Sequence, residues 1–334
     1  MTEAGDGFEY QVSGIMGADF ADGRGNVSIA LSTNKREASF QRTTDFYKKI
    51  WADTSTAAGN QFFIDRPGIN FGFGNLPNFN LVFPTANPPI PLFGTTVYTN
   101  VDGTAFTNGF GARGGVPNFN SPNTENSFYK LMDNGTLGQV NTGFYLILPL
   151  TRYNMFMRGN YEINDWIGVF AQGLYSHVST ATRNEPGPIF AGWGANIDPT
   201  RLDRDQLPDD LWTLLDSRPN PDAPFTLTAL MPDERETFTD VSTYNLTAGL
   251  EGSIPGTDWT WEAFANFGES ETYAKQTGVY SLERVRTVLN SGNFGVGFRQ
   301  QGNPSQGGFG ASTATCTSGL NFCRPPPGGV SADC

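Results

Sequence analysis

Six segments of this chain alternate between apolar and polar residues with a period of two. Such alternation predicts β-strands with apolar side chains on one face and polar side chains on the other. In the segment 167–182 the pattern is ambiguous, because Phe170 and Leu174 fall on the otherwise polar face. The expected apolar faces of the remaining segments are, in chain order, Phe8, Tyr10, Val12 and Met16; Val27, Ile29 and Leu31; Tyr153, Met155, Met157 and Tyr161; Tyr244, Leu246, Ala248 and Leu250; and Trp259, Trp261, Ala263, Ala265 and Phe267.

The connections between these segments alternate between very short and very long. Tight turns at residues 19–25, 163–166 and 254–258 join the segments in pairs. The hairpins expected from this pairing cover about residues 8–40, 150–182 and 238–277. The loops between and after them are 41–149, 183–237 and 278–334. Such loops are far longer than the few residues usual between elements of a compact domain.

Short turns on one rim and long loops on the other are typical of bacterial outer-membrane β-barrels. The segments are about 10 to 16 residues long, and a tilted strand needs about 9–11 residues to cross a bilayer. Tyr161, Trp166, Trp259 and Trp261 lie beside the tight turns, as in the aromatic girdles of such barrels. A soluble β-sandwich or solenoid would show the same alternation. The long loops and the tryptophan positions favour an all-β, partial antiparallel transmembrane barrel of about six strands.

The long loops are rich in Gly, Pro, Asn and Phe. Asn–Phe and Gly–Phe pairs recur at 70–74, 77–80 and 117–120, and we expect these rings to pack the loop on itself or, alternatively, to stack on an apolar or sugar ligand. Two short helices are predicted within the loops. One covers 207–215 and begins at Pro208; the other covers 282–290 and is capped by Ser281.

Composition narrows the possible partners and locations. The net charge of −12 argues against nucleic acid as a partner, since phosphate binding requires a basic surface. The most apolar stretch, 144–150, is far shorter than the ~20 residues of a membrane-spanning helix. The N-terminus has no basic start or apolar stretch of a signal peptide, and the C-terminus ends within a loop. We therefore expect a piece of a longer exported protein rather than a cytoplasmic protein.

The residues that could carry chemistry are few. Cys316, Cys323 and Cys334 lack an accompanying His for a zinc site, and a loop disulfide among them is expected, with the pairing left open. The only histidine, His177, has no partner in the sequence that would make it a base. The chain contains no Gly-x-Ser-x-Gly, P-loop or His-Glu-x-x-His motif. The sequence therefore predicts a protein without enzymatic activity and without a cofactor.

Several blocks of the sequence resemble the TonB-dependent outer-membrane receptors. These blocks are spread along the chain and cover about a fifth of it. They are residues 17–27, 149–154, 161–166, 214–225, 244–252, 255–262 and 297–304. They resemble a central part of the barrel of such receptors, and the Phe-rich loop has no counterpart among them.

The resemblance implies a barrel of about 22 strands whose lumen holds an N-terminal plug. It also implies import of a scarce nutrient of the siderophore, cobalamin or oligosaccharide class, energised by an inner-membrane complex. This chain has about six such strands, no plug and no TonB-contacting box, so the function is expected of the whole receptor. Loops would be extracellular and tight turns periplasmic. Asn160, Glu162, Glu251 and Glu262 would then face the lumen and the plug, since they oppose the lipid-facing aromatic residues.

Two other functions are compatible with the sequence. A secreted or surface-exposed β-rich module could use its loops to bind glycans or cells. A soluble β-rich hydrolase is a third candidate, which the lack of a catalytic constellation disfavours. The flanking genomic sequence separates them, because an upstream plug of about 150 residues is expected only for the receptor.

Overall fold

A computed structural model of the chain describes residues 5–57, 60–61, 64–84, 96–107, 119, 129–133, 137–140, 143–190, 194–301, 311, 313–331 and 334. The chain divides into two compact units, each built from three separate stretches of sequence. Unit 1 comprises Met1–Asp45, Gly143–Asn184 and Arg235–Thr277. Unit 2 comprises Phe46–Thr142, Glu185–Glu234 and Gly278–Cys334.

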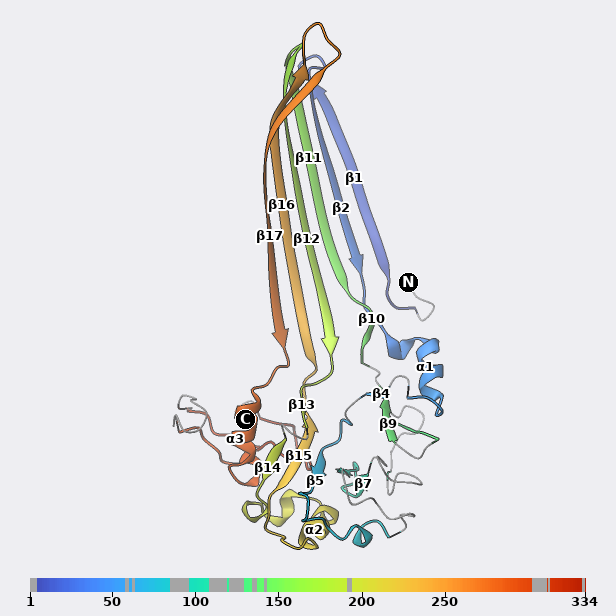
Figure 1. The fold of residues 1–334 in the computed structure, drawn as a ribbon, viewed down its shortest axis with the longest axis vertical. Coiled ribbons are helices and arrows are strands. Elements are labelled where there is room, and N and C mark those ends of the chain that lie inside the picture. The colour runs from blue at the N-terminus through green and yellow to red at the C-terminus, as the bar shows by residue number, and fades with distance from the viewer. Residues whose placement is uncertain are drawn as a thin grey trace. The chain divides into compact units, whose positions relative to one another are not determined.

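Unit 1 is a single antiparallel sheet of six long strands in the order β1-β2-β11-β12-β16-β17 (Figure 1). The strands are β1 Glu9–Phe20, β2 Gly25–Arg36, β11 Leu150–Asn164, β12 Ile167–Asn184, β16 Arg235–Ser253 and β17 Thr260–Thr277. A two-stranded ladder of β3 (Ser39–Phe40) and β10 (Tyr145–Ile147) and the short helix η1 (Gln41–Thr43) belong to the same unit. The antiparallel β architecture expected from the alternation is thus confirmed. Among the described strands the sheet is open, with β1 and β17 at its edges.

The pairing register gives the sheet two distinct faces. Residues directly opposite each other on neighbouring strands project from the same face, and the register continues without a shift across the sheet except at Glu162/Asn164. Phe170 and Leu174, the ambiguous residues of the sequence pattern, lie on the polar face, opposite Asn160 and Phe156. The alternation of β12 is therefore regular in space, with three apolar side chains, Phe170, Leu174 and Val178, on the polar side.

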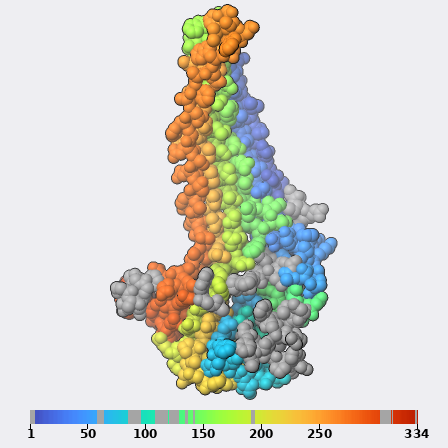
Figure 2. Space-filling model, in the orientation of Figure 1, coloured from blue at the N-terminus to red at the C-terminus, as the bar shows by residue number. Residues whose placement is uncertain are grey.

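Unit 1 has almost no hydrophobic interior. Among its described hydrophobic side chains, Phe170 is the only buried one. Leu246 is 55 % exposed and Phe267 is 60 % exposed. The side chains of β17 lie at the surface along the strand (Figure 2, orange). A single sheet of this kind leaves its apolar face without a covering layer from its own described residues.

Unit 2 consists of short elements contributed by all three long loops. Strands β13 Pro188–Ile189, β15 Phe225–Leu230, β5 Gly68–Asn70, β6 Val97–Thr99 and β7 Ala105–Thr107 pair in that order, and β14 Ala195–Ile197 also pairs with β15. A second sheet has the order β4 Asn60–Gln61, β9 Leu137–Val140 and β8 Tyr129–Leu131. The helices are α2 Asp209–Asp216, α3 Leu282–Leu289, η2 Phe79–Leu81, η3 Pro199–Arg201, η4 Arg204–Gln206 and η5 Asn293–Gly295. Helix α1, Asp45–Ala52, begins at the last residue of a unit 1 segment and continues into unit 2.

The two helices expected in the loops are confirmed. Pro208 occupies the N-cap of α2, where its missing N–H group costs no helical hydrogen bond. The side chain of Ser281 caps α3 by accepting a hydrogen bond from the Arg284 N–H group. Helix α1 was not expected from the sequence, and Trp51 is its only buried residue.

The core of unit 2 joins the three loops. It combines Ile69, Phe79, Phe83 and Val97 of the first loop, Leu211, Leu214, Leu215 and Phe225 of the second, and Val288, Leu289, Phe294 and Cys316 of the third. The expected packing of the Phe-rich loop holds for Phe79, which is buried, and for Phe71, which packs against this core. Phe73 is exposed. In the 117–120 block, Phe119 contacts the rings of Phe106 and Tyr129, and the other residues lie outside the described ones.

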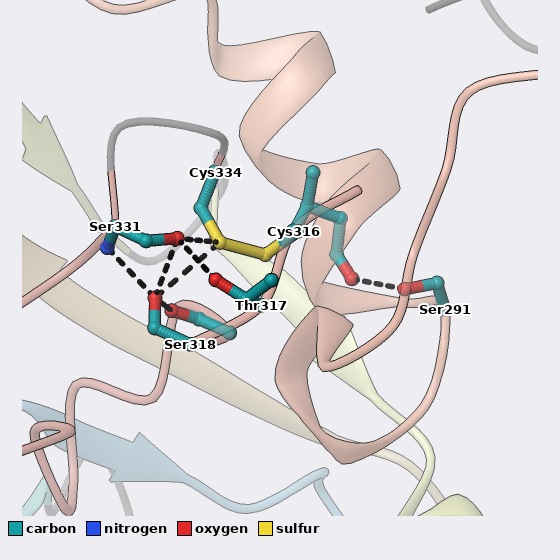
Figure 3. The surroundings of a disulfide bond; sticks show 8 residues. Ser291, Cys316, Thr317, Ser318, Ser331 and Cys334 are labelled. Carbon is teal, nitrogen blue, oxygen red and sulfur yellow. Dashed lines mark hydrogen bonds between the residues drawn. A yellow bond between two sulfur atoms is a disulfide. The ribbon is translucent and has the colours of Figure 1, made fainter. Parts of the chain in front are cut away.

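Two of the cysteines form a disulfide. Cys316 and Cys334 are bonded, 18 residues apart in the sequence, beside a hydrogen-bonded group of Thr317, Ser318 and Ser331 (Figure 3). Cys323 is a free, buried thiol. Among the described residues, no helix has the length and apolar character needed to cross a membrane.

Candidate functional site

The residues predicted to face a lumen lie together on the polar face of unit 1, near the tight turns. In the register, Glu162 is opposite Gly168, Gly168 is opposite Glu251, and Glu251 is opposite Glu262. Directly opposed side chains have Cβ atoms about 5 Å apart, so Glu251 and Glu262 are immediate neighbours. Gly168 between them is buried and has no side chain, and a Cβ atom there would lie 3.2 Å from the Tyr161 carbonyl oxygen. Asn160 lies on the same face, two residues from Glu162 along β11.

This acidic row is only partly neutralised. Among the described residues, the row makes one ion pair, in which Arg158 Nη2 lies 4.0 Å from Glu251 Oε2. Both side chains are substantially exposed. Like charges directly opposite each other on a sheet are destabilising. The row of three glutamates therefore presents a net negative surface that a basic partner would stabilise.

Phe170 forms an apolar centre within this polar face. It is 6 % exposed, and the Arg158 guanidinium carbon lies 5.8 Å from the centre of its ring. A Cβ atom on Gly249 would lie 2.9 Å from Phe170 Cε1 and 2.6 Å from the Ala263 carbonyl oxygen. Gly249 thus creates the space that Phe170 occupies. The signal was present in the sequence, since a glycine inside a strand marks a close approach.

The rest of the polar face is a hydrogen-bonded network across strands. Asn245 and Asn266 exchange reciprocal amide hydrogen bonds of 3.0 and 2.8 Å. Asn154 donates to Ser32 Oγ at 3.0 Å and accepts from Ser176 Oγ at 2.9 Å. These amides and hydroxyls suit contact with water or with polar protein surface rather than with lipid.

The opposite face carries an apolar band bounded by aromatic rings on both sides. The turn-side aromatic row consists of Phe20, Tyr161, Trp166, Trp259 and Trp261. The far aromatic row consists of Tyr10, Tyr153, Tyr175, Tyr244 and Tyr273, which the register places on the apolar face. Tyr10, Tyr153 and Tyr244 were expected on the apolar face from their alternation, but a second aromatic row was not expected. From Tyr161 to Tyr153 along β11 the separation is about 26 Å at about 3.3 Å per residue.

Small and apolar residues make up two rows within this band, and towards its far edge Glu269 of β17 also lies on this face, opposite Tyr244. One row across all six strands consists of Ala18, Val27, Gly159, Ala171, Ala248 and Ala265. The next consists of Met16, Ile29, Met157, Gly173, Leu246 and Phe267. Neither row contains a charged or hydrogen-bonding side chain, so this part of the sheet can only make dispersion and hydrophobic contacts.

His177 lies on the apolar side, beyond this band. Its ring stacks on Tyr153 with centroids 6.4 Å apart, and Nδ1 lies 3.0 Å from Ser242 Oγ. No carboxylate is hydrogen-bonded to the imidazole among the described residues, so the arrangement lacks the orienting acid of a catalytic triad. Within the same described part of the chain, no cluster of His, Cys, Asp and Glu is placed to hold a metal ion.

Comparisons of the chain with protein-family models, with curated proteins and with solved structures return no match.

Proposed function

We propose that this chain is a central part of the barrel of a TonB-dependent outer-membrane receptor. In the whole receptor the apolar face contacts lipid and the polar face lines the lumen. The protein imports a scarce nutrient of the siderophore, cobalamin or oligosaccharide class, using energy supplied by an inner-membrane complex. Unit 2 lies on the extracellular side and the tight turns on the periplasmic side.

The observation that carries this proposal is the bounded apolar band on an uncovered sheet. Burying apolar surface contributes about 25 cal/mol per Å², and unit 1 leaves large side chains such as Leu246 and Phe267 exposed. A hydrocarbon layer removes that surface from water. The two aromatic rows are about 26 Å apart along β11, which at the roughly 40° strand tilt of outer-membrane barrels corresponds to a height of about 20 Å, somewhat less than their roughly 25 Å apolar band.

The acidic row supports the assignment of the other face. In a barrel with a plug, Glu162, Glu251 and Glu262 contact the plug surface, which is expected to present basic groups opposite them. Arg158, already 4.0 Å from Glu251, offsets part of the charge before the plug is present. The polar network of Asn154 and Asn245 then faces water or plug side chains in the lumen.

Unit 2 also supports a second candidate, a surface-exposed binding module. It has its own core and a disulfide, which suits an extracellular domain. The uncovered apolar face of unit 1 favours the receptor, because a water-soluble module requires a second layer there.

Location and orientation test the proposal in the full-length protein that contains this chain. It should fractionate with the outer membrane and migrate differently in gels before and after heating, as folded barrels do. A cysteine at exposed Asp222 in unit 2 should react with an impermeant maleimide on intact cells. A cysteine at exposed Asp258, in the turn between β16 and β17, should react only after the outer membrane is permeabilised. A monodisperse full-length protein in detergent-free buffer would contradict the proposal.

A further inference from the structure

Unit 2 contains a cavity of about 920 Å³ lined by all three loops. Its walls are formed by residues 65–67 and 99–104 of the first loop, 208–210 and 229–232 of the second, and the segment 320–330 of the third. Small-molecule sites in proteins commonly measure about 300–1,000 Å³. The size of the cavity therefore fits a ligand of several rings.

Hydrogen bonds between the loops fix the walls relative to one another. Asp210 accepts a hydrogen bond from the Ala105 N–H group at 2.8 Å. Asn321 Nδ2 donates to the Gln206 carbonyl at 2.6 Å, and Arg324 Nη1 donates to the Asp205 carbonyl at 2.7 Å. These bonds connect the second loop to the first and to the third. The cavity is thus formed before a ligand arrives, which lowers the entropic cost of binding.

The disulfide confines the third wall. Residues 320–330 lie between Cys316 and Cys334, and the bond closes this stretch into a loop (Figure 3). Asn321 stiffens the loop from within, because its side-chain oxygen accepts hydrogen bonds from the N–H groups of Cys323 and Arg324 at 3.1 and 3.0 Å. The wall therefore keeps its shape even though Arg324 is exposed to solvent.

The charged groups of the cavity limit the chemistry of its ligand. They are Asp65, Asp102, Asp209, Asp210, Arg66 and Arg324. An anionic ligand would lie among four carboxylates, and a cationic ligand would lie against two guanidinium groups. Hydroxyl groups satisfy both sets, since they donate to carboxylates and accept from guanidinium N–H groups. A neutral ligand rich in hydroxyl groups is the best match.

Asp209 and Arg66 are the groups most available to such a ligand. Asp209 is exposed in the first turn of α2 and makes no side-chain hydrogen bond or ion pair with the described residues. Arg66 has a loose ion pair, 4.0 Å from its Nε to Asp65 Oδ1. Asp65 accepts a hydrogen bond from the Tyr129 hydroxyl, and burial raises the pKa of its carboxyl. Asp65 is thus committed to the wall, whereas the Asp209 carboxylate and the Arg66 guanidinium can form hydrogen bonds with a ligand.

Apolar surfaces complete the lining. Pro208, Pro232 and Phe322 border the cavity, and Phe322 also packs against the core of unit 2. Such surfaces complement the C–H faces of sugar rings, while the charged groups bind the hydroxyl edges. From this combination we infer that the cavity binds a neutral oligosaccharide. The inference rests on the proposed receptor function, for which it specifies the nutrient class and the first binding site.

A glycan array probed with the full-length protein tests the ligand class. The array carries neutral oligosaccharides such as maltotetraose, cellotetraose, xylotetraose and chitotetraose. It also carries an anionic galacturonate tetramer and the cationic deacetylated chitosan tetramer. Binding confined to neutral glycans supports the inference. Preference for the uronate or for deacetylated chitosan overturns it, as does the absence of binding to every glycan in a protein that still shows outer-membrane location and heat-modifiable migration.

Calorimetry with the best-bound glycan tests the site. Asp209→Asn should weaken binding roughly tenfold or more, since hydrogen bonds to charged groups contribute more than neutral ones. Glu283→Gln is the matched control, because Glu283 is an exposed acid in the first turn of α3 and lies outside the cavity. It should leave affinity unchanged. Equal affinity of Asp209→Asn and the wild type overturns the site while leaving the receptor function intact.

Discussion

The two units of this chain treat apolar side chains in opposite ways. In unit 2 they are collected into one core, in which Leu214 and Phe294 have no exposed surface. In unit 1 they are spread over one face of a sheet, and Phe170 is the only buried hydrophobic side chain among its described residues. The strands of unit 1 largely alternate between apolar and polar residues, whereas unit 2 brings apolar residues together from distant loops.

This difference shows where each unit obtains its stability. Unit 2 supplies its own apolar surroundings, and its core residues contact one another. Unit 1 depends on surroundings that its own strands do not provide. Under the proposed function, lipid covers one face and plug or water covers the other. The comparison can be tested by changing matched residues in the two units.

The largest effect is expected for Leu214→Ala in the core of unit 2. Truncating a fully buried leucine typically costs about 2–5 kcal/mol, because a cavity term adds to the transfer term. Leu250→Ala on the apolar face of unit 1 should cost less, since mobile lipid chains fill the vacated space. Denaturant unfolding of the full-length protein, followed by probes in each unit, measures both. An equal or larger cost for Leu250→Ala would contradict the contrast between the units.

A charge on the apolar face should be the next most damaging change. Leu246→Arg lies within the apolar band, where an arginine near the membrane midplane costs about 2–4 kcal/mol. Asn245→Arg is the control, because Asn245 is adjacent in β16 but on the polar face. The fraction of protein assembled in the outer membrane should fall strongly for Leu246→Arg and only slightly for Asn245→Arg. If both variants assemble equally, the lipid-facing assignment is wrong.

Filling the space beside Phe170 tests the apolar centre of the polar face. Gly249→Ala places a Cβ atom 2.6 Å from the Ala263 carbonyl oxygen and 2.7 Å from Phe264 Cβ. Overpacking of this kind costs typically about 1–3 kcal/mol. Gly14→Ala in β1 is the control, since its Cβ atom meets nothing within 4 Å. Thermal unfolding should separate the two variants, and indistinguishable midpoints would refute the packing role of Gly249.

The smallest effect concerns the buried thiol of unit 2. Burial raises the pKa of Cys323 to about 12, whereas a thiol in an unfolded chain titrates near pH 8.5. Below that pH both states are protonated and the thiol contributes no pH dependence. As pH rises further, only the unfolded state loses the proton, so the contribution to stability falls by up to about 1.4 kcal/mol per pH unit. Above about pH 12 the folded state titrates too.

Cys323→Ala isolates this contribution. The loss of stability between pH 8 and pH 10, measured by denaturant unfolding, should be smaller in Cys323→Ala than in the wild type. The native thiol should also resist maleimide at pH 8, because the thiolate is the reactive form. Rapid labelling of the folded protein would contradict its burial.

Local patterns in the sequence were sufficient for much of unit 1. Alternation within one strand shows which residues share a face of that strand, without knowledge of the partner strand. Because the register is regular, the polar faces of neighbouring strands coincide, and Asn160, Glu162, Glu251 and Glu262 lie on one face of the sheet. The caps of α2 and α3 are likewise local signals. Phe170 disagreed with its strand pattern because the residue that accommodates it, Gly249, lies on another strand.

Unit 2 could not be predicted in the same way. Its core joins Ile69 to Leu227 and both to Val288, and contacts between residues so distant in sequence leave no periodic trace. The Phe-rich loop was therefore expected to pack on itself or to stack on a ligand. The cavity that they line was missed for the same reason. The cysteine pairing also depends on the folded path of the third loop, since three cysteines in the sequence allow any of the pairs.

The discontinuous core of unit 2 has a consequence for the order in which the protein assembles. No continuous stretch of the chain encodes this unit, because Phe83, Leu211 and Phe294 come from three loops separated by strand hairpins. Under the proposed function, the first loop therefore stays incompletely packed until the third has been synthesised and delivered to the same side of the membrane. Unit 2 would then complete its folding only after all three hairpins have been delivered.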